Sequence, residues 1–202
     1  MAFSTIKEIA ASNVYEDMSG TPALALPVDK AAADDRRDRL AALYDAHEER
    51  LYNLARRLAA SASEADDLVQ ETFVRAARSL SSIPAGPTKE EAWLVRVLIN
   101  IRRDEWRRVR VSRRFGAILG HSDIASDSNA ESALIAKRAV WAALDRLHPR
   151  RRAIIVMFEL EGMTPSAIAA LLGISVMTVR WHLSMARRDL RRILEPQMGD
   201  IQ

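Results

Sequence analysis

Apolar residues recur every three to four positions over most of this chain, which is the pattern of amphipathic α-helices. A first helix is expected from about residue 34 to residue 60, with inward positions Leu40, Leu43, Tyr44, Leu51, Leu54, Ala55 and Leu58. A second, capped by Ser63, has inward positions Ala65, Leu68, Val69, Thr72, Phe73, Ala76 and Leu80. A third begins with Thr88 and Glu91 as a capping box and buries Trp93, Leu94, Val97, Leu98 and Ile101.

The same spacing resumes after residue 132. Leu134, Trp141, Leu144 and Leu147 indicate one helix, and Pro149 separates it from an apolar stretch that Gly162 ends. Because helical patterns account for both halves of the chain, we predict an all-α protein.

The segment from Thr164 to Arg192 predicts two helices joined by a tight turn. Thr164 is a natural N-cap, and Pro165 suits the first helical turn. Gly173 tolerates the positive φ that such a turn requires, and Ser175 can cap the second helix. This arrangement is a helix-turn-helix, whose second helix fits the major groove of DNA.

The pattern weakens in two places, which divides the chain. Residues 1–33 contain Gly20, Pro22 and Pro27 and are expected to form a flexible N-terminal extension. Residues 115–132 are rich in polar and small side chains and are expected to form a flexible linker. We therefore predict two small helical domains, over 34–114 and 133–195, with the helix-turn-helix in the second.

Composition excludes several kinds of chemistry. The chain of 202 residues has no cysteine, so disulfides, thiolate zinc sites and cysteine nucleophiles are excluded. Its four histidines are dispersed and have no metal-ligand spacing, and no apolar run is long enough to span a membrane. We expect a cytoplasmic protein without metal, cofactor or small-molecule substrate.

The modest net charge of +3 hides a concentration of arginine. The third helix continues into IRRDEWRRVRVSRR, with arginines at 102, 103, 107, 108, 110, 113 and 114. Like charges so close together repel one another, and a nearby polyanion would remove that cost. An aromatic side chain in this run, Trp106, can stack on a nucleobase.

The predicted recognition helix also carries cations, on the face opposite its apolar positions Val179 and Leu183. Such a face can supply both phosphate and base-edge contacts. The DNA contacts expected from this segment are Thr164, Thr178, Arg180, Trp181, His182, Ser184, Met185, Arg187 and Arg188.

Three segments resemble the bacterial RNA polymerase sigma factors. EADDLVQETFVRAARSL, from Glu64 to Leu80, is similar to their core-polymerase-binding segment. AWLVRVLINIRRDEWRR, from Ala92 to Arg108, resembles the segment that melts and reads the minus-ten promoter element. The stretch from Ala143 to Arg192 resembles the domain that reads the minus-thirty-five element. A chain with only these two domains is similar to the extracytoplasmic-function (ECF) group.

The resemblance implies a function and its partners. It implies a sigma factor that binds core RNA polymerase, directs it to promoter DNA and helps to melt the minus-ten element, with an anti-sigma factor as a further partner. Asp67, Gln70 and Glu71 match the polymerase-contacting pattern and suit an arginine-rich coiled coil on the polymerase clamp. The minus-ten contacts that it implies are Trp93, Arg96, Asn100, Arg102, Arg103, Trp106, Arg107 and Arg108.

Two other classes of function remain open at this point. A helix-turn-helix regulator that binds duplex DNA without polymerase would explain the second half of the chain. It would leave the acidic stripe from Asp66 to Glu71 and the arginine patch from Arg102 to Arg114 without a joint purpose. An enzyme is not expected, because the chain has no nucleophile–base set, phosphate loop or paired carboxylates placed for catalysis.

Overall fold

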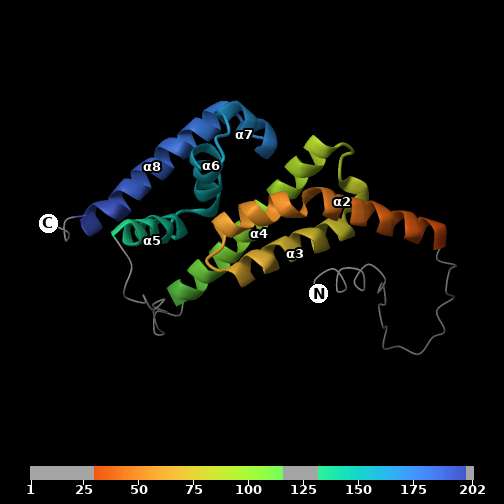
Figure 1. The fold of residues 1–202 in the computed structure, drawn as a ribbon, viewed down its shortest axis with the longest axis horizontal. Helices are drawn as coiled ribbons and strands as arrows, with labels where there is room; N and C mark the ends of the chain where they lie inside the picture. Colours follow the sequence, from red (N-terminus) through yellow and green to blue (C-terminus); the bar gives the residue numbers. More distant parts are fainter. Residues whose placement is uncertain (1–29, 116–131, 199–202) are drawn as a thin grey trace.

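A computed structural model describes residues 30–115 and 132–198 of the chain, and these residues form helices without a strand. The elements are α2 (Lys30–Leu58), α3 (Ala62–Arg78), the 3-10 turn η1 (Leu80–Ser82), α4 (Pro87–Phe115), α5 (Ser132–Asp145), α6 (Pro149–Glu159), α7 (Pro165–Leu172) and α8 (Val176–Met198) (Figure 1). The predicted all-α class is confirmed. Residues 30–33 of the predicted extension over 1–33 belong to α2, and the end residues of the predicted linker over 115–132 belong to α4 and α5. The rest of both segments lies outside the described residues.

The first three helices pack pairwise around a shared apolar centre. Contacts join α2 to α3, α3 to α4 and α2 to α4. Phe73 lies fully buried at the centre and tilts against the ring of Tyr44, with ring centroids 4.7 Å apart. The inward positions expected from the periodicity are buried here, apart from Tyr44, Trp93 and Val97, which are half-buried at the edge of the core.

Three of the predicted helix starts were wrong: α2 begins at Lys30 rather than near residue 34, and α3 and α4 each begin two residues earlier than predicted. Ser61, not Ser63, caps α3, and its hydroxyl accepts a hydrogen bond from the Glu64 amide. Helix α4 begins at Pro87, and the Glu90 carboxylate accepts from the Gly86 amide. Glu91 instead pairs with Arg50 at 3.0 Å. The starts of α3 and α4 each have a sequence signal that the prediction missed. Ser61 stands three residues before Glu64, as in a capping box, and Pro87 suits the first position of a helix.

The last four helices form the second half. Helix α8 contacts α5, α6 and α7, and α6 also contacts α7. Ile154, Met157, Ile168 and Val179 are fully buried where these helices meet. Figure 1 shows α8 as a long rod along one side of this half, with α6 set at an angle to it.

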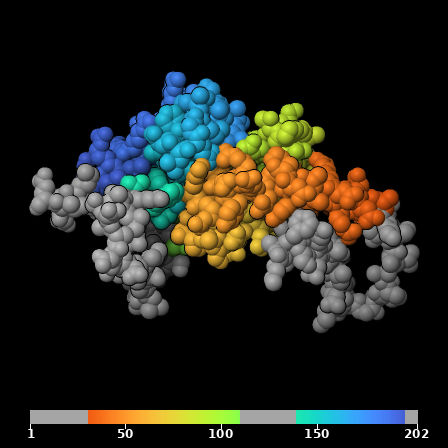
Figure 2. Space-filling model, viewed as in Figure 1, coloured from red at the N-terminus to blue at the C-terminus, as the bar shows by residue number. Residues whose placement is uncertain are grey.

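The two halves pack against each other and share one continuous core. Helix α4 contacts both α6 and α7, and α2 contacts α6. Figure 2 shows the second half lying directly against α2. Hydrophobic periodicity does not predict this contact, because it identifies which face of a helix is apolar but not which helix will cover that face.

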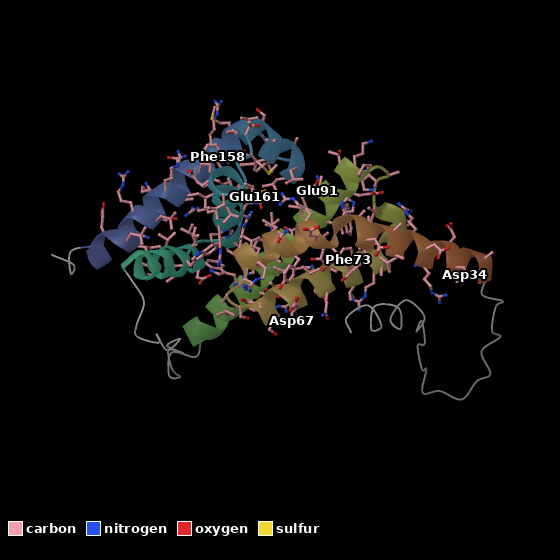
Figure 3. All side chains as sticks on the ribbon, viewed as in Figure 1. Asp34, Asp67, Phe73, Glu91, Phe158 and Glu161 are labelled. Atoms are coloured by element: carbon pink, nitrogen blue, oxygen red, sulfur yellow. The ribbon has the colours of Figure 1, made fainter. Side chains whose placement is uncertain are left out.

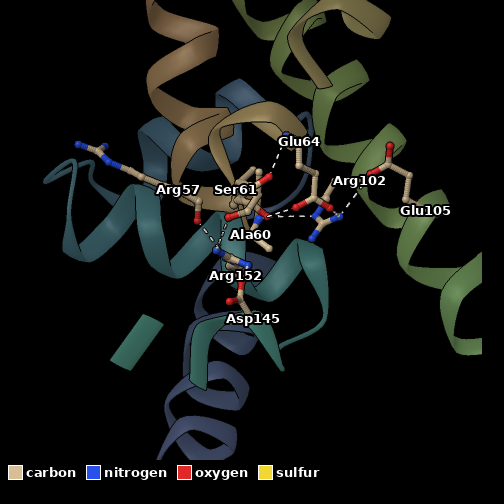
Figure 4. A network of polar contacts seen from close by, with 10 residues as sticks. Arg57, Ala60, Ser61, Glu64, Arg102, Glu105, Asp145 and Arg152 are labelled. Atoms are coloured by element: carbon tan, nitrogen blue, oxygen red, sulfur yellow. Dashed lines mark hydrogen bonds and ion pairs between the residues drawn. The ribbon is translucent and has the colours of Figure 1, made fainter. Parts of the chain in front are cut away.

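Two arginines from other helices donate hydrogen bonds to backbone carbonyls at the carboxyl end of α2 (Figure 4). Arg102 of α4 donates from Nε to the Leu58 carbonyl at 3.0 Å. Arg152 of α6 donates to the Arg57 carbonyl at 2.9 Å and to the Ala59 carbonyl at 3.4 Å. The last carbonyls of a helix have no partner within it and carry partial negative charge, so cations at this place are favourable.

Buried ion pairs reinforce the contact between the halves. Glu161, after α6, accepts from Arg50 at 2.7 Å and from Arg57 at 2.8 Å, both on α2. Its side chain is only 8% exposed, so water screens these pairs weakly. Arg152, 4% exposed, also pairs with Asp145 of α5. Polar contacts as well as apolar packing therefore fix how the second half sits on α2.

Candidate nucleic-acid interface

Helices α7 and α8 form the predicted helix-turn-helix. The Thr164 hydroxyl accepts from the Ala167 amide at 3.2 Å, and the Ser175 hydroxyl accepts from the Thr178 amide at 3.1 Å, so both predicted caps are confirmed. Gly173 has φ +66°, as the turn requires. The chain bends by 110° between the two helices, within the range of DNA-binding helix-turn-helix units.

The second helix of this unit divides into a buried face and an exposed face. Val179, Leu183 and Ala186 lie in the core. Most of the predicted DNA contacts on α8 are exposed, namely Arg180, Trp181, Ser184, Arg187 and Arg188. Thr178, His182 and Met185 are half-buried, and Thr178 is held by a hydroxyl contact of 2.8 Å to Ser175. The exposed face thus combines cations with an aromatic side chain and a hydroxyl group.

Neighbouring side chains hold two members of this exposed face. The Arg151 guanidinium lies 5.7 Å from the centre of the Trp181 ring and forms an ion pair with Asp189. Arg187 pairs with Glu159 at 2.8 Å and lies over the ring of Phe158. Trp181 is therefore oriented before any partner binds, and a phosphate that contacts Arg187 must compete with a carboxylate.

The arginines of α4 differ in their surroundings. Arg102 is paired with Glu64 at 2.6 Å and Glu105 at 3.4 Å, in addition to its contact with α2. Arg103 is half-buried, whereas Arg107 and Arg108 are exposed. The sequence-based assignment of all four to DNA stays a prediction, and the geometry suits it best for Arg107 and Arg108.

Two of the remaining predicted contacts on α4, Arg96 and Trp106, lie near the second half of the protein. A Cβ atom added at Gly173 would stand 3.3 Å from Nη1 of Arg96, so the turn between α7 and α8 lies close to this arginine. The Trp106 ring meets the His148 ring edge-on, with centroids 5.1 Å apart. Trp93 packs against the core, and Asn100 is half-buried. Arg96 is itself half-buried, and α7 packs on the helix that carries it.

The predicted polymerase contacts lie on α3. Asp67 is exposed on the side of the molecule away from α7 and α8, as its label in Figure 3 shows. Gln70 and Glu71 are half-buried, and Glu71 pairs with Arg75 at 2.9 Å. Their positions at i, i+3 and i+4 place the three side chains on one face of the helix.

Two histidines lie in a strongly cationic environment between α4, α6 and α8. Burial lowers the pKa of His148, and the charges of Arg151, Arg150, Arg103 and Arg107 lower it further. The pKa of His182 is lowered in the same way, by burial and then by Arg150, Arg151 and His148. Nδ1 of His148 also accepts from the Arg150 amide at 3.3 Å, which requires the unprotonated nitrogen. Both rings are therefore neutral at neutral pH.

Acidification is expected to destabilise the fold through these histidines. Below about pH 6.5 the unfolded chain binds protons that the folded chain resists, so the free energy of unfolding falls as pH falls through that value towards the lowered folded pKa. Replacing His148 by Asn, which can still cap a helix, together with His182→Gln should flatten this dependence. Thermal unfolding followed by circular dichroism between pH 7 and pH 5 measures it, and an equally steep fall in the double variant would contradict the assignment.

Sequence reasoning missed the residues that join the two halves, namely Arg50, Arg57, Arg152 and Glu161. One signal was available for Arg152, which is four residues before buried Val156 and therefore on the same face of α6. A cationic residue on the apolar face of a helix indicates that a buried group elsewhere in the fold pairs with it. The partners themselves, about 95 residues away in sequence, leave no local pattern.

Within residues 30–115 and 132–198 no single helix combines the length and hydropathy needed to cross a membrane. Only the bent pair α7–α8 meets these criteria jointly, on length and composition alone. In the same part of the chain no cluster of three or more His, Asp or Glu side chains could hold a metal ion.

Comparison with solved structures supports the architecture. The sigma factor RpoE of Bartonella quintana, solved with the anti-sigma factor NepR, aligns with a TM-score of 0.51 at 24% identity, covering 82% of this chain and 98% of that one. CnrH, solved with the cytosolic domain of CnrY, aligns with a TM-score of 0.50 at 24% identity, covering 97% and 99%. At this identity the likeness concerns the fold.

Comparison of sequences identifies the family. Residues 43–111 match sigma-70 region 2, and residues 137–190 match sigma-70 region 4. The chain is 37% identical over 153 residues to the ECF RNA polymerase sigma factor SigE of Mycolicibacterium smegmatis, covering 73% of this chain but 58% of SigE. It is 34% identical over 159 residues to SigL of Mycobacterium tuberculosis, covering 76% of this chain and 88% of SigL. The chain belongs to the ECF sigma factors of bacterial RNA polymerase.

Proposed function

We propose that this chain binds core RNA polymerase, directs it to a set of promoters and helps to open the minus-ten element. The observation that carries the proposal is the exposed, cationic face of α8, set on a helix-turn-helix whose caps and turn are formed. An exposed cationic face does not stabilise an isolated folded domain, whereas it can bind the phosphates and base edges of a DNA duplex.

The two matched regions are assigned different binding roles. We assign residues 34–114 to polymerase binding and the minus-ten element, and residues 133–195 to the minus-thirty-five element, with 115–132 as the linker and 1–33 as an extension. In the first region Asp67, Gln70 and Glu71 contact polymerase. Its minus-ten contacts are Trp93, Arg96, Asn100, Arg103, Trp106, Arg107 and Arg108, and Arg102 supports them through its ion pairs.

The packing of the two halves sets a condition for this function. Because α7 lies on α4 with Gly173 close to Arg96, promoter DNA gains access to the whole face of α4 only after the second half has moved. The ion pairs of Glu161 and the hydrogen bonds of Arg152 would break in that movement. Binding to polymerase and DNA must therefore offset their loss.

An anti-sigma factor fits the same scheme. Both structural neighbours were solved with a second protein, named as an anti-sigma factor in one case. We propose that this chain also has such a partner, which would hold it away from polymerase.

Reconstitution tests the proposed function directly. The full chain should co-purify with core RNA polymerase and confer promoter-dependent run-off transcription on it. Binding to promoter duplex without polymerase, combined with no association with core enzyme, would contradict the proposal and favour a regulator of the helix-turn-helix type.

The exposed arginines of α4 should contribute to DNA binding through phosphates. Replacing Arg107 and Arg108 by alanine should weaken open-complex formation and reduce its salt dependence by roughly one slope unit per lost contact. The matched control replaces Arg36 and Arg56, two exposed arginines of α2, and should leave the slope unchanged. Permanganate footprinting over a salt series measures both. An unaltered slope in the α4 variant would mean that these arginines are only a solvated helix end.

A further inference from the structure

Two large apolar side chains are exposed to solvent near the amino-terminal end of α8, the predicted recognition helix. Met177 is 71% exposed and Trp181 is 52% exposed. Among the side chains of residues 31–109 and 139–195, five large hydrophobic ones are exposed, and the other three, Val109, Val140 and Leu160, lie on other helices or at their ends. Met177 and Trp181 are four positions apart and thus lie on one face of α8, one turn from each other.

Their place in the helix-turn-helix indicates what they meet. The first turns of a recognition helix approach the base edges, and Ser175 caps the helix so that Met177 is its second residue. Arg180 lies between Met177 and Trp181 in sequence, and Arg187 and Arg188 follow further along the same exposed side. These cations would contact phosphates and so place the apolar pair within the groove.

The major groove offers few partners to an apolar side chain. The floor of the groove presents hydrogen-bond donors and acceptors, and the C5-methyl group of thymine is its one apolar feature. Trp181 is already oriented, because its ring lies beneath the Arg151 guanidinium and meets the His182 ring edge-on. An oriented ring loses little conformational freedom on binding.

We propose that Met177 and Trp181 read thymine methyl groups in the upstream promoter element, at positions within about two base-pair steps of each other. One turn of α-helix rises about 5.4 Å, and base pairs stack at about 3.4 Å, which sets this spacing. The inference rests on the proposed function and names the chemical group that the recognition helix selects. Met177 thereby becomes a specificity-determining residue.

Deoxyuridine substitution tests this directly, because uracil lacks only the methyl group of thymine. Holoenzyme assembled from the full chain and core RNA polymerase first selects an upstream element from a randomised promoter library. Each thymine of that element is then replaced by deoxyuridine, and binding is measured by competition. Replacement at one or two neighbouring positions should weaken binding about three- to five-fold each, as expected for burial of a methyl-sized group.

Variants assign each methyl group to its side chain. In Met177→Ala holoenzyme one of the sensitive thymines should tolerate deoxyuridine, and in Trp181→Ala holoenzyme the other should. Leu160→Ala, which removes an exposed apolar side chain outside α8, should keep the wild-type pattern. The inference is supported if each α8 variant loses sensitivity at one thymine and Leu160→Ala keeps sensitivity at both.

Other outcomes overturn it. If a selected element tolerates deoxyuridine everywhere, the proposed function stands and methyl readout does not. If Met177→Ala instead weakens assembly with core polymerase in the absence of DNA, the apolar pair binds protein and the inference is wrong. If no element is selected at all, the proposed function fails, and this inference fails with it.

Discussion

Replacing Asp67 and Glu71 by arginine is expected to abolish binding to core RNA polymerase. Both side chains lie on one face of α3, and Asp67 is exposed on the side away from the second half of the protein. If this face meets a cationic surface of the polymerase, reversing two charges places like charges opposite one another. Such juxtaposition costs several kcal/mol, which corresponds to a loss of affinity of about 100-fold or more.

Control measurements must show that the charge reversal, and not a loss of folding, abolishes binding to polymerase. Glu71 pairs with Arg75, so its reversal also creates a like-charge pair on the helix, at a cost of about 0.2–0.5 kcal/mol. Circular dichroism should therefore show an unchanged helix content. Reversal of Asp35 and Asp38, two exposed carboxylates of α2, gives the same change in net charge and should preserve polymerase binding. Equal affinity of the α3 variant and this control would refute the assignment.

Replacing Arg152 by leucine is expected to lower the free energy of unfolding by about 3 kcal/mol or more. The change removes hydrogen bonds to the Arg57 and Ala59 carbonyls and leaves Asp145 without its cation. Removing a buried donor is costly because backbone carbonyls that it served stay desolvated and unpaired, whereas the exposed Asp145 carboxylate regains water. Guanidinium chloride unfolding, followed by circular dichroism, measures the loss.

Arg191→Leu is the matched substitution, since Arg191 is exposed on α8. Its effect should stay within about 0.5 kcal/mol, as for most surface positions. A comparably small loss in Arg152→Leu would mean that the contact between the two halves contributes little. Arg152→Lys should lower the free energy of unfolding by an intermediate amount, because lysine keeps the charge but cannot form the forked contacts of a guanidinium.

The helix-turn-helix shows how far local chemistry determines structure. The cap at Thr164, the turn at Gly173 and the cap at Ser175 were all predicted from neighbouring residues, and all three are formed. Each depends on contacts within three or four residues, which sequence spacing specifies directly. The start of α3 was missed although a local signal exists, because Ser61, and not Ser63, stands three residues before Glu64, the spacing of a capping box.

The arginines show what sequence could not determine. By charge alone Arg102, Arg107 and Arg108 are equivalent, and all were predicted to contact DNA. The fold brings Glu64, Glu105 and the end of α2 to Arg102, which leaves the other two exposed. Whether an arginine is structural or available to a ligand depends on residues far away in sequence, and periodicity does not encode them.

The sequence by itself determined the helical class, the apolar face of each helix and the recognition helix, because these follow from contacts along a single helix or turn. Only the tertiary structure decided that α7 lies on α4, that Glu161 joins Arg50 and Arg57, and that Arg152 is buried. Those features depend on where separate helices meet, and an apolar face can be covered by any surface of matching shape and polarity.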